Sequence, residues 1–427
     1  MTDLSEALAR VKQASWLNRP AVRAVFDLLD GDQGHVRAVG GIVRNTILGD
    51  PVSDVDMASI FTPEEVLDRA AKAKIRAIPT GIEHGTVTLV FDDETIEVTT
   101  LRQDVATNGR HAKVVFGTDW EEDAKRRDFT MNALYVMADG TLFDPLNGVQ
   151  DCLDRNVHFI GDAVARIEED YLRILRFFRF FAYYGAGRPE AGGLKAAAKL
   201  KTGVKQLSAE RVWAEFKKIL SAPDPSRALL WMRTTGVLAM VLPEGEKWGM
   251  DAIHGVVAAE QELNWQIDPL FRLISIIPPQ AEKTKVLADR LKLSNDEAAR
   301  LHNWALQPVI APETSAKELD KLLYWGNQTA ILDRICLDLA ALRQKLKQDE
   351  NMELMGQIGA LHQHMERAQA WTAPAFPIGG KDLIELGMTP GEELGKVLKT
   401  LEQYWVDKDF KPGREALLDK AKSDFAI

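Results

Sequence analysis

Cysteine is scarce in this chain, with only Cys152 and Cys336 among 427 residues. The two lie far apart, and neither has a second cysteine at the short spacing of a zinc-binding motif. This excludes a disulfide framework and a cysteine-type zinc site. It also favours a cytoplasmic protein, because cytosolic thiols are kept reduced.

Long apolar runs and an excess of positive charge are also missing. No run approaches the roughly 18 apolar residues that span a bilayer, so no membrane partner is expected. The 53 lysines and arginines are outnumbered by 63 aspartates and glutamates, which leaves a net charge of −10. A general positive coat for nucleic acid is therefore excluded, and any RNA site must be a local basic patch.

What is present is the composition of a globular protein, with 46% hydrophobic and 27% charged residues. Strand signals crowd into the first third of the chain. Alternation and turn residues predict strands over residues 35–39, 52–58, 85–91, 95–101, 133–137 and 141–143, and a helix over 62–73. After about residue 160, helical spacing dominates, and Asp162, Ser208, Ser294 and Ser315 are predicted N-caps. The pattern indicates an α+β head followed by an all-α remainder.

An acidic pair and a glycine turn lie close together in the head. Asp54 and Asp56 would place both carboxylates on one face if they lie on a strand. Mg²⁺ usually takes one or two protein carboxylates and completes its shell with water and phosphates. Gly40 and Gly41 precede a helix-like run, where backbone N–H groups can approach phosphate. Arg44 follows one helical turn later and could bind phosphate through two hydrogen bonds.

A second informative segment, residues 168–185, reads as one helix. Its charged row holds Asp170, Arg173, Arg176 and Arg179, between two apolar rows that can be buried. Cytosine and adenine each present an amino donor beside a ring acceptor, which Asp170 and Arg173 could match. Uracil and guanine present the reverse pattern, so both contacts would become repulsive. An ordinary amphipathic helix with a salt bridge is the alternative.

Three motifs together resemble a known family. They are GGxVRx₃LGx₄DxD over residues 40–56, RRDFTMNAL over 126–134 and EDYLR over 169–173. Their order and spacing are similar to those of class II tRNA nucleotidyltransferases and the related bacterial poly(A) polymerases. The resemblance implies a polymerase β-like nucleotidyltransferase head that precedes an all-α neck, body and tail.

The resemblance also implies roles for individual residues. Asp54 and Asp56 would be the catalytic residues and would hold Mg²⁺ as the cofactor. The nucleotide-binding residues would be Gly41, Arg44, Arg127, Asp170, Arg173, Arg176 and Arg179. Glu97 is either a third carboxylate of the metal site or a member of an ordinary cross-strand ion pair.

The domains implied are a catalytic head at 1–158, a neck at 159–245 and a body and tail at 246–427. The neck would carry the nucleotide-selecting helix and an RNA-binding segment, and the body and tail would bind tRNA. The expected activity adds C, C and A to the tRNA 3′ end from CTP and ATP by a two-metal in-line nucleotidyl transfer that releases pyrophosphate.

Other activities on the same fold stay open at this point. They are a poly(A) polymerase, a partial enzyme that adds only CC or only A, and an inactive RNA-binding relative. The acidic charge balance and the tail segment over residues 377–401 argue against a poly(A) polymerase. The intact motifs argue against an inactive relative. The sequence leaves the oligomeric state open.

Overall fold

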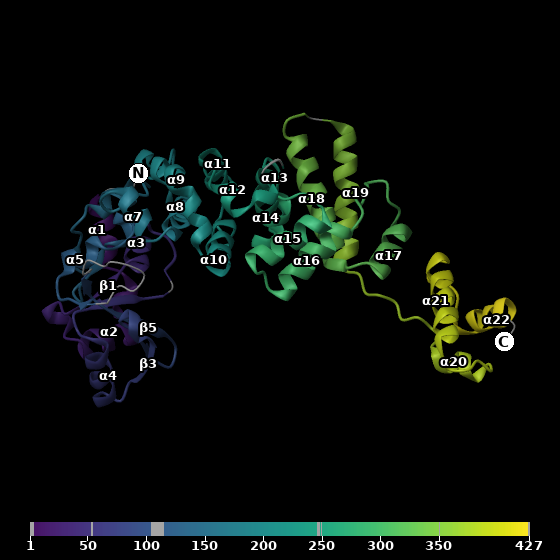
Figure 1. The fold of residues 1–427 in the computed structure, drawn as a ribbon, viewed down its shortest axis with the longest axis horizontal. Helices are drawn as coiled ribbons and strands as arrows, with labels where there is room; N and C mark the ends of the chain where they lie inside the picture. Colours follow the sequence, from purple (N-terminus) through teal and green to yellow (C-terminus); the bar gives the residue numbers. More distant parts are fainter. Residues whose placement is uncertain are drawn as a thin grey trace. The chain divides into compact units, whose positions relative to one another are not determined.

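A computed structural model describes residues 4–52, 54–103, 115–245, 248, 250–349 and 351–425. The chain divides into two compact units, Met1–Pro243 and Glu244–Ile427. Figure 1 shows the strands in the purple and blue part of the first unit, whereas the green and yellow second unit is built from helices. None of the described helices is long and apolar enough to cross a membrane.

The first unit is built on a seven-stranded sheet with the order β3-β4-β5-β2-β1-β8-β9. Its strands are β1 (Val36–Val39), β2 (Asp56–Ser59), β3 (Arg76–Gly81), β4 (Thr86–Val90), β5 (Thr95–Thr100), β8 (Tyr135–Val136) and β9 (Leu142–Phe143). Strands β2 and β5 are parallel, and the other neighbouring strands are antiparallel. A separate two-stranded ribbon joins β6 (Arg102–Gln103) to β7 (Val115–Phe116).

Most of the predicted strands are confirmed, but β2 and β8 begin later than predicted, and β3, β6 and β7 were not predicted. Strand β2 begins at Asp56, later than predicted, because the described residues 52, 54 and 55 take no part in the ladder with β1 or β5. Strand β3 was not predicted. It is an edge strand whose residues are mostly exposed, so the apolar alternation of a half-buried strand is absent.

Six helices lie in the same part of the chain as this sheet. They are α1 (Leu4–Lys12), α2 (Pro20–Leu28), α3 (Gly41–Leu48), α4 (Pro63–Lys72), α5 (Trp120–Lys125) and α6 (Gly148–Leu153). Helix α3 contacts β1, and α4 contacts β3 and β4. The prediction for α4 is confirmed: Thr62 accepts from the backbone N–H of Glu65, whose side chain caps Thr62 in return.

The remaining helices of the first unit are α7 (Ala163–Glu169), α8 (Leu172–Tyr184), α9 (Ala191–Leu200), α10 (Ala209–Leu220), α11 (Ser226–Thr235) and α12 (Val237–Val241). The prediction of one helix over residues 168–185 is wrong, since α7 ends before Asp170. Asp170 is extended, with φ −154°, and its carboxylate accepts the backbone N–H of Leu172 at 3.0 Å. This local hydrogen bond begins a new helix, as short polar side chains do at helix starts.

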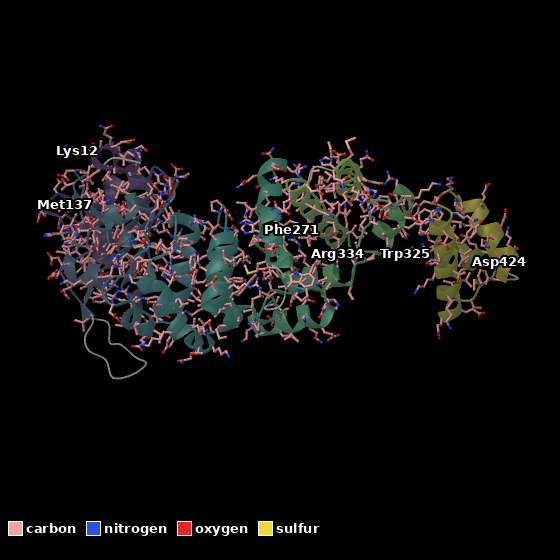
Figure 2. All side chains as sticks on the ribbon, turned by 90° about the horizontal axis from the view of Figure 1, so that it is seen from above. Lys12, Met137, Phe271, Trp325, Arg334 and Asp424 are labelled. Atoms are coloured by element: carbon pink, nitrogen blue, oxygen red, sulfur yellow. The ribbon has the colours of Figure 1, made fainter. Side chains whose placement is uncertain are left out.

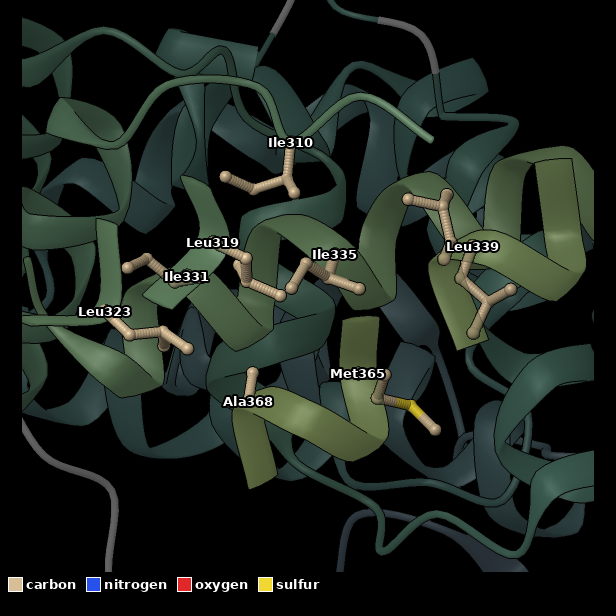
Figure 3. Packing of buried hydrophobic residues seen from close by; sticks show 9 residues of the cluster. Ile310, Leu319, Leu323, Ile331, Ile335, Leu339, Met365 and Ala368 are labelled. Carbon is tan, nitrogen blue, oxygen red and sulfur yellow. The ribbon is translucent and has the colours of Figure 1, made fainter. Parts of the chain in front are cut away.

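The second unit contains α13 (Ala252–Leu263), α14 (Pro269–Ser275), α15 (Ala281–Leu291), α16 (Asn295–Leu306), α17 (Ala316–Trp325), α18 (Gln328–Leu346), α19 (Met352–Gln369), α20 (Gly380–Glu385), α21 (Glu392–Asp407) and α22 (Arg414–Phe425). The predicted N-caps Ser294 and Ser315 both close capping boxes. One apolar core joins α17, α18 and α19 through residues such as Leu319, Ile335 and Met365 (Figure 3).

A second apolar core holds the last three helices together. It contains Leu383 of α20, Leu401 and Trp405 of α21, and Leu417 of α22. Charged side chains are also buried in this unit, where Arg272 donates to Glu260 at 2.5 Å with both side chains almost fully buried. Figure 2 shows how densely side chains cover the helices, with Phe271, Arg334 and Trp325 labelled in this unit.

Candidate active site

A polar pocket of about 360 Å³ lies at the ends of β1, β2 and β5 in the first unit. It brings together residues from the first two sequence motifs and Arg176 of α8. Its polar lining includes Gly40, Gly41, Arg44, Asp56, Glu97, Arg102, Arg126, Arg127, Asp128, Asn132 and Arg176. Residues separated by more than a hundred positions in the sequence therefore meet at one cavity.

Two carboxylates stand side by side in this pocket. Asp56 is the register partner of Glu97 in the parallel pair β2–β5, so the two side chains share one face of the sheet. Asp54 and Asp56 are both exposed, whereas Val55 between them is buried. The alternation places Asp54 on the side of Asp56, although Asp54 precedes the strand and does not line the pocket.

The pKa of Asp56 is affected by burial and by the charged groups around it. Desolvation raises the pKa of Asp56, the negative charges of Glu97 and Asp54 raise it further, and the charge of Arg127 lowers it. Like charges that raise a carboxyl pKa are relieved when a cation binds between them. The donors are hard carboxylate oxygens, which suit a divalent ion such as Mg²⁺. The acidic group therefore fits a cation.

The described residues contain no preformed cluster of three or more His, Cys, Asp or Glu side chains that could hold a metal ion. Asp54 and Asp56 offer a pair of carboxylates. A pair is what Mg²⁺ commonly takes when nucleotide phosphates supply further oxygens. Glu97 lies beside Asp56 as an electrostatic neighbour.

The glycine turn follows β1 directly. Gly40 has φ +72° and ψ −121°, a conformation that residues with a Cβ rarely adopt. Gly41 then begins α3 and lines the pocket, at the end of a helix where backbone N–H groups have no acceptor within the helix. The sequence prediction of a strand, a glycine turn and a helix start is confirmed here.

Arg44 is buried below this turn, with only 6% of its surface exposed. Its guanidinium donates to Asn132 at 2.7 Å, to Asn45 at 2.9 Å and to the Tyr184 hydroxyl at 2.7 Å. Burial lowers the pKa of Arg44. All of these partners are neutral, so the positive charge of Arg44 is available to an anionic ligand.

Arg127 is held in place by the buried carboxylate of Asp123. Asp123 is fully buried and pairs with Arg127 at 3.1 Å and with Arg126 at 2.5 Å, and it accepts the hydroxyl of Tyr135. Burial alone would raise the pKa of Asp123, but the two arginines lower it below its usual range. Asp123 and Tyr135 in turn raise the pKa of Arg127 against the effect of burial. Arg127 is therefore a fixed cation beside the pocket.

Asp128, the third residue of the same motif, ties the head to α8. Its carboxylate accepts two hydrogen bonds from Arg176, at 2.7 and 2.5 Å, and one from Asn132 at 2.9 Å. Burial would raise the pKa of Asp128, but Arg176 lowers it. Arg176 is thus fixed against the pocket wall by a buried acid.

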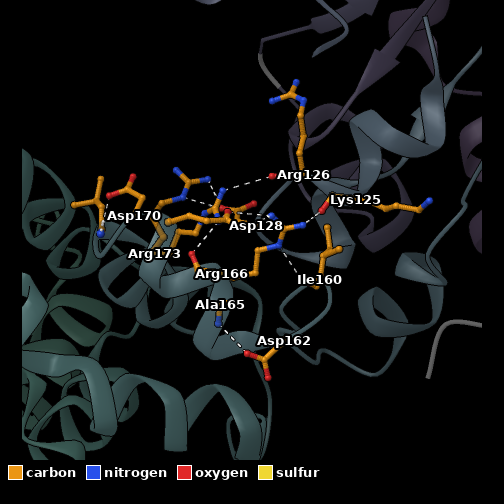
Figure 4. A network of polar contacts seen from close by, with 12 residues as sticks. Lys125, Arg126, Asp128, Ile160, Asp162, Ala165, Arg166, Asp170 and Arg173 are labelled. Atoms are coloured by element: carbon orange, nitrogen blue, oxygen red, sulfur yellow. Dashed lines mark hydrogen bonds and ion pairs between the residues drawn. The ribbon is translucent and has the colours of Figure 1, made fainter. Parts of the chain in front are cut away.

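Asp170 and Arg173 lie near the pocket but do not line it. Asp170 accepts from Arg211 at 2.7 Å, whereas Arg173 pairs with Glu169 and donates to the backbone oxygen of Arg166 at 2.9 Å. Arg173 also donates to the backbone oxygen of Arg126 at 3.4 Å, which joins it to the RRDFTMNAL motif (Figure 4).

The partners of Asp170 and Arg173 were missed at the level of sequence. Glu169 could have been found, because it lies four positions before Arg173, the spacing of a helical ion pair. Arg211 comes from α10, and no local signal connects it to Asp170. Arg179 lies outside the pocket and donates to Glu215 of α10 at 3.2 Å.

Comparison with known proteins supports the motif assignment. The family described as "Poly A polymerase head domain" matches residues 36–158, and "Probable RNA and SrmB- binding site of polymerase A" matches residues 193–248. CCA tRNA nucleotidyltransferase 1, mitochondrial, of Mus musculus is 33% identical over 94% of this chain and 89% of its own length. The Danio rerio protein of the same name is 34% identical over 96% of this chain and 92% of its own length.

The fold agrees with these matches. The crystal structure of the Bacillus stearothermophilus CCA-adding enzyme in complex with CTP superposes with a TM-score of 0.73 at 24% identity, over 96% of this chain and 98% of that chain. The predicted nucleotidyltransferase head followed by a helical remainder is thereby confirmed as the fold. Together with the curated relatives, this shows that the chain belongs to the CCA-adding tRNA nucleotidyltransferases, a family of enzymes within the tRNA nucleotidyltransferase/poly(A) polymerase group.

Proposed function

We propose that this enzyme adds C, C and A to the 3′ end of tRNA from CTP and ATP. The observation that carries the proposal is the pocket in which Asp56 faces a glycine turn and fixed arginines. Further support comes from relatives that are named as CCA-adding enzymes and align over nearly the whole chain.

In this proposal the 3′-hydroxyl oxygen of the tRNA attacks the α-phosphorus of the nucleotide. The bond from the α-phosphorus to the oxygen that bridges to the β-phosphate breaks, and its electron pair leaves with pyrophosphate. Positioning and electrostatic stabilisation are sufficient for such a transfer, without a covalent protein intermediate. Gly41, Arg44 and Arg127 would bind the triphosphate, because they line the pocket with backbone N–H groups and cations.

Asp54 and Asp56 would hold Mg²⁺, as their position and the raised pKa of Asp56 suggest. A bound divalent ion supplies Lewis-acid activation of the hydroxyl and stabilises the developing negative charge. The carboxylates would hold the ion at the start of β2, next to the glycine turn that would receive the phosphates. Arg176 would contact the nucleotide from the pocket lining, where Asp128 holds its guanidinium in place.

Asp170 and Arg173 would read the base. Both lie at the start of α8, next to the motif that holds the phosphates. An acceptor from Asp170 and a donor from Arg173 match the edges of cytosine and adenine. Uracil and guanine would present an acceptor to Asp170 and a donor to Arg173, so both contacts would be repulsive.

We also propose three functional parts: a catalytic head at 1–158, a selecting neck at 159–245 and a tRNA-binding body and tail at 246–427. The end of the first compact unit at Pro243 supports a boundary near residue 245. The neck includes most of residues 193–248, which match a family segment described as a probable RNA-binding site.

The test uses purified protein and three tRNA transcripts, which end before C, after C and after CC. Each transcript is incubated with one nucleoside triphosphate at a time, with Mg²⁺ or with EDTA. We expect C on the first two, A on the third and no product with EDTA. Long A tails on any RNA would instead indicate a poly(A) polymerase. Addition of only CC or only A would indicate a partial enzyme, and no product with any combination would indicate an inactive relative.

A further inference from the structure

Arg37 of β1 is a buried cation that belongs to none of the three motifs. Only 9% of its surface is exposed, and its Nε and Nη1 groups are buried without a hydrogen-bond partner in the described part of the chain. Its guanidinium carbon instead lies 4.0 Å from the ring centre of Trp120 and 4.6 Å from that of Phe143, so two aromatic faces surround the charge. Burying N–H groups without partners lowers stability, and such a cost is typical of residues that serve a functional site.

Strand register brings the Tyr135 ring to the same two aromatic residues. Val39 is paired with Tyr135 on β8, and Tyr135 is paired with Phe143 on β9, so these side chains share one face of the sheet. Arg37 lies two residues before Val39 and therefore points to the same face. The centre of the Tyr135 ring lies 5.5 Å from that of Trp120 and 5.9 Å from that of Phe143. Both rings that contact Arg37 therefore also contact Tyr135.

The hydroxyl of Tyr135 leads from this aromatic group to the pocket. Tyr135 is fully buried, and its hydroxyl donates to Asp123 at 2.9 Å and accepts from Nε of Arg127 at 3.1 Å. The same Nε group also donates to Asp123, at 3.2 Å. The carboxylate fixes the charge of Arg127, and the hydroxyl adds a neutral acceptor that fixes the direction of its guanidinium. Arg127 lines the pocket, so its orientation there depends on Tyr135.

We propose that Tyr135 and Arg37 are positioning residues for nucleotide binding. The hydroxyl of Tyr135 orients Arg127 toward the triphosphate. Arg37 holds the Tyr135 ring in place through the two aromatic residues that it contacts. Neither Tyr135 nor Arg37 lines the pocket, so both act through Arg127. The proposal rests on the proposed function, in which Arg127 binds the triphosphate.

The test uses three single variants of the full chain. Tyr135→Phe removes only the hydroxyl, and Arg37→Met removes the charge between the two rings but keeps an apolar side chain. Tyr324→Phe is the matched control, because the Tyr324 hydroxyl donates to a carboxylate of the second unit, that of Glu402, at 2.6 Å. Thermal unfolding verifies that each variant is folded. Calorimetric titration with CTP and Mg²⁺ in the absence of tRNA measures nucleotide affinity, and steady-state assays give KM for CTP, ATP and tRNA.

For Tyr135→Phe we expect CTP to bind about three- to tenfold more weakly, the effect of one lost hydrogen bond. KM for CTP and ATP should rise by a similar factor, whereas KM for tRNA should not change. Arg37→Met should weaken CTP binding by about two- to fourfold, the effect of one cation–π contact, without a lower unfolding temperature, because it removes N–H groups that lack partners. Tyr324→Phe should lower the unfolding temperature but bind CTP as the wild type does.

A coupling measurement separates positioning from a general loss of stability. Arg127→Lys keeps a cation beside Asp123 but lacks the Nε–H group that Tyr135 accepts. If Tyr135 acts through Arg127, Tyr135→Phe should weaken CTP binding by less than about twofold in the Arg127→Lys background.

Unchanged CTP binding in Tyr135→Phe would overturn the proposal, as would fully additive losses in the double variant or an equal loss in Tyr324→Phe. Unchanged CTP binding in Arg37→Met would overturn the role of Arg37. A wild type that binds no CTP would also overturn the proposal. A wild type that binds CTP but adds no nucleotide to tRNA would refute only the proposed function, and the titrations would still decide the role of Tyr135.

Discussion

Asp56 lies directly beside Glu97 because β2 and β5 are the one parallel pair in the described sheet of the first unit. In this register the two acidic side chains lie on the same face of the sheet, and each lies in the electric field of the other. The pKa of Asp56 is raised as a result, after the larger effect of desolvation. The acidic end of the pocket is thus a property of strand pairing, which brings Glu97 to a motif about forty positions earlier in the chain.

The first prediction distinguishes the role of Asp56 from that of its neighbour Glu97. Asp56→Asn and Asp54→Ala should each lower nucleotide incorporation by at least about 100-fold, the scale of losing one preorganised charged group at a reacting centre. Glu97→Gln should cost much less, because Glu97 would act on Asp56 through its charge and would not bind the ion. Single-turnover incorporation rates measure both effects, and filter binding should show that tRNA affinity is unchanged. A loss in Glu97→Gln as large as that in Asp56→Asn would make Glu97 a third ligand.

The second prediction concerns Asp170, which has two tasks in the structure. It caps the start of α8 through Leu172 and accepts from Arg211. Asn is a good cap but is not charged, so Asp170→Asn should keep the helix start while it relaxes discrimination against UTP and GTP. Asp170→Ala should lose both and also lower the unfolding free energy by about 1 kcal/mol. Incorporation ratios for the four nucleotides measure selectivity, and ratios equal to the wild type in both variants would remove Asp170 from base reading.

The third prediction uses two adjacent glycines. Gly40 has φ +72° and ψ −121°, so Gly40→Ala should destabilise the protein by about 1–3 kcal/mol, the cost of a strained backbone. Gly41 begins α3 in an ordinary helical position, and an added Cβ would lie 3.6 Å from Arg44, a normal contact distance. Gly41→Ala should therefore be close to neutral in denaturant unfolding. Equal destabilisation by the two changes would mean that the turn does not require its left-handed residue.

The fourth prediction tests the buried ion pair of the second unit. Arg272→Met should lower stability by about 3–5 kcal/mol, because it leaves the Glu260 carboxylate buried and without its partner. Lys420→Met removes one side of the more exposed Lys420–Asp424 pair and should change stability by less than about 1 kcal/mol. The double variant Arg272→Met with Glu260→Leu should recover most of the loss. Calorimetry of the full chain gives these values, and a double variant as unstable as Arg272→Met would argue against an unpaired charge as the cause.

The fifth prediction concerns thiol chemistry. Burial raises the pKa of both Cys152 and Cys336 to about 12. Both thiols are therefore neutral at pH 8, and the thiolate is the reactive form. The native protein should be almost inert to iodoacetamide at this pH, whereas both residues should react in denaturant. Mass spectrometry counts the added groups, and rapid labelling of the native chain would contradict this prediction.

The sequence predicted the parts of the fold that follow local rules. Thr62, Asp162, Ser208 and Ser294 all cap helices as expected, and the strand, glycine turn and helix around Gly40 are as predicted. Strand β3 was missed because an exposed edge strand has no apolar face to reveal it. The break at Asp170 was missed because the helical spacing of apolar residues continues past it. The backbone at Asp170 is nevertheless extended and ends α7.

The site was predicted less completely, since its composition depends on pairings between distant segments. The motifs identified Arg127 and Arg176, but not that Asp123 and Asp128 hold them in place. The pairing of Asp170 with Arg211 depends on how α10 packs against α8, and no spacing in the sequence encodes it. The roles given to the motif residues, the domain limits and the cytoplasmic location stay predictions.

The ion pairs of Asp170 and Arg173 have a consequence for how a base would be selected. Arg211 pairs with Asp170 and Glu169 pairs with Arg173, so each of the two groups already has a protein partner of opposite charge. An incoming base would have to replace both protein partners at once. Hydrogen bonds to cytosine or adenine would compensate for most of the lost ion pairs. With uracil or guanine, the original ion pairs would stay more favourable. Selectivity would then arise because the base competes with the protein's own side chains for Asp170 and Arg173. Only a base that supplies a donor and an acceptor together would displace them.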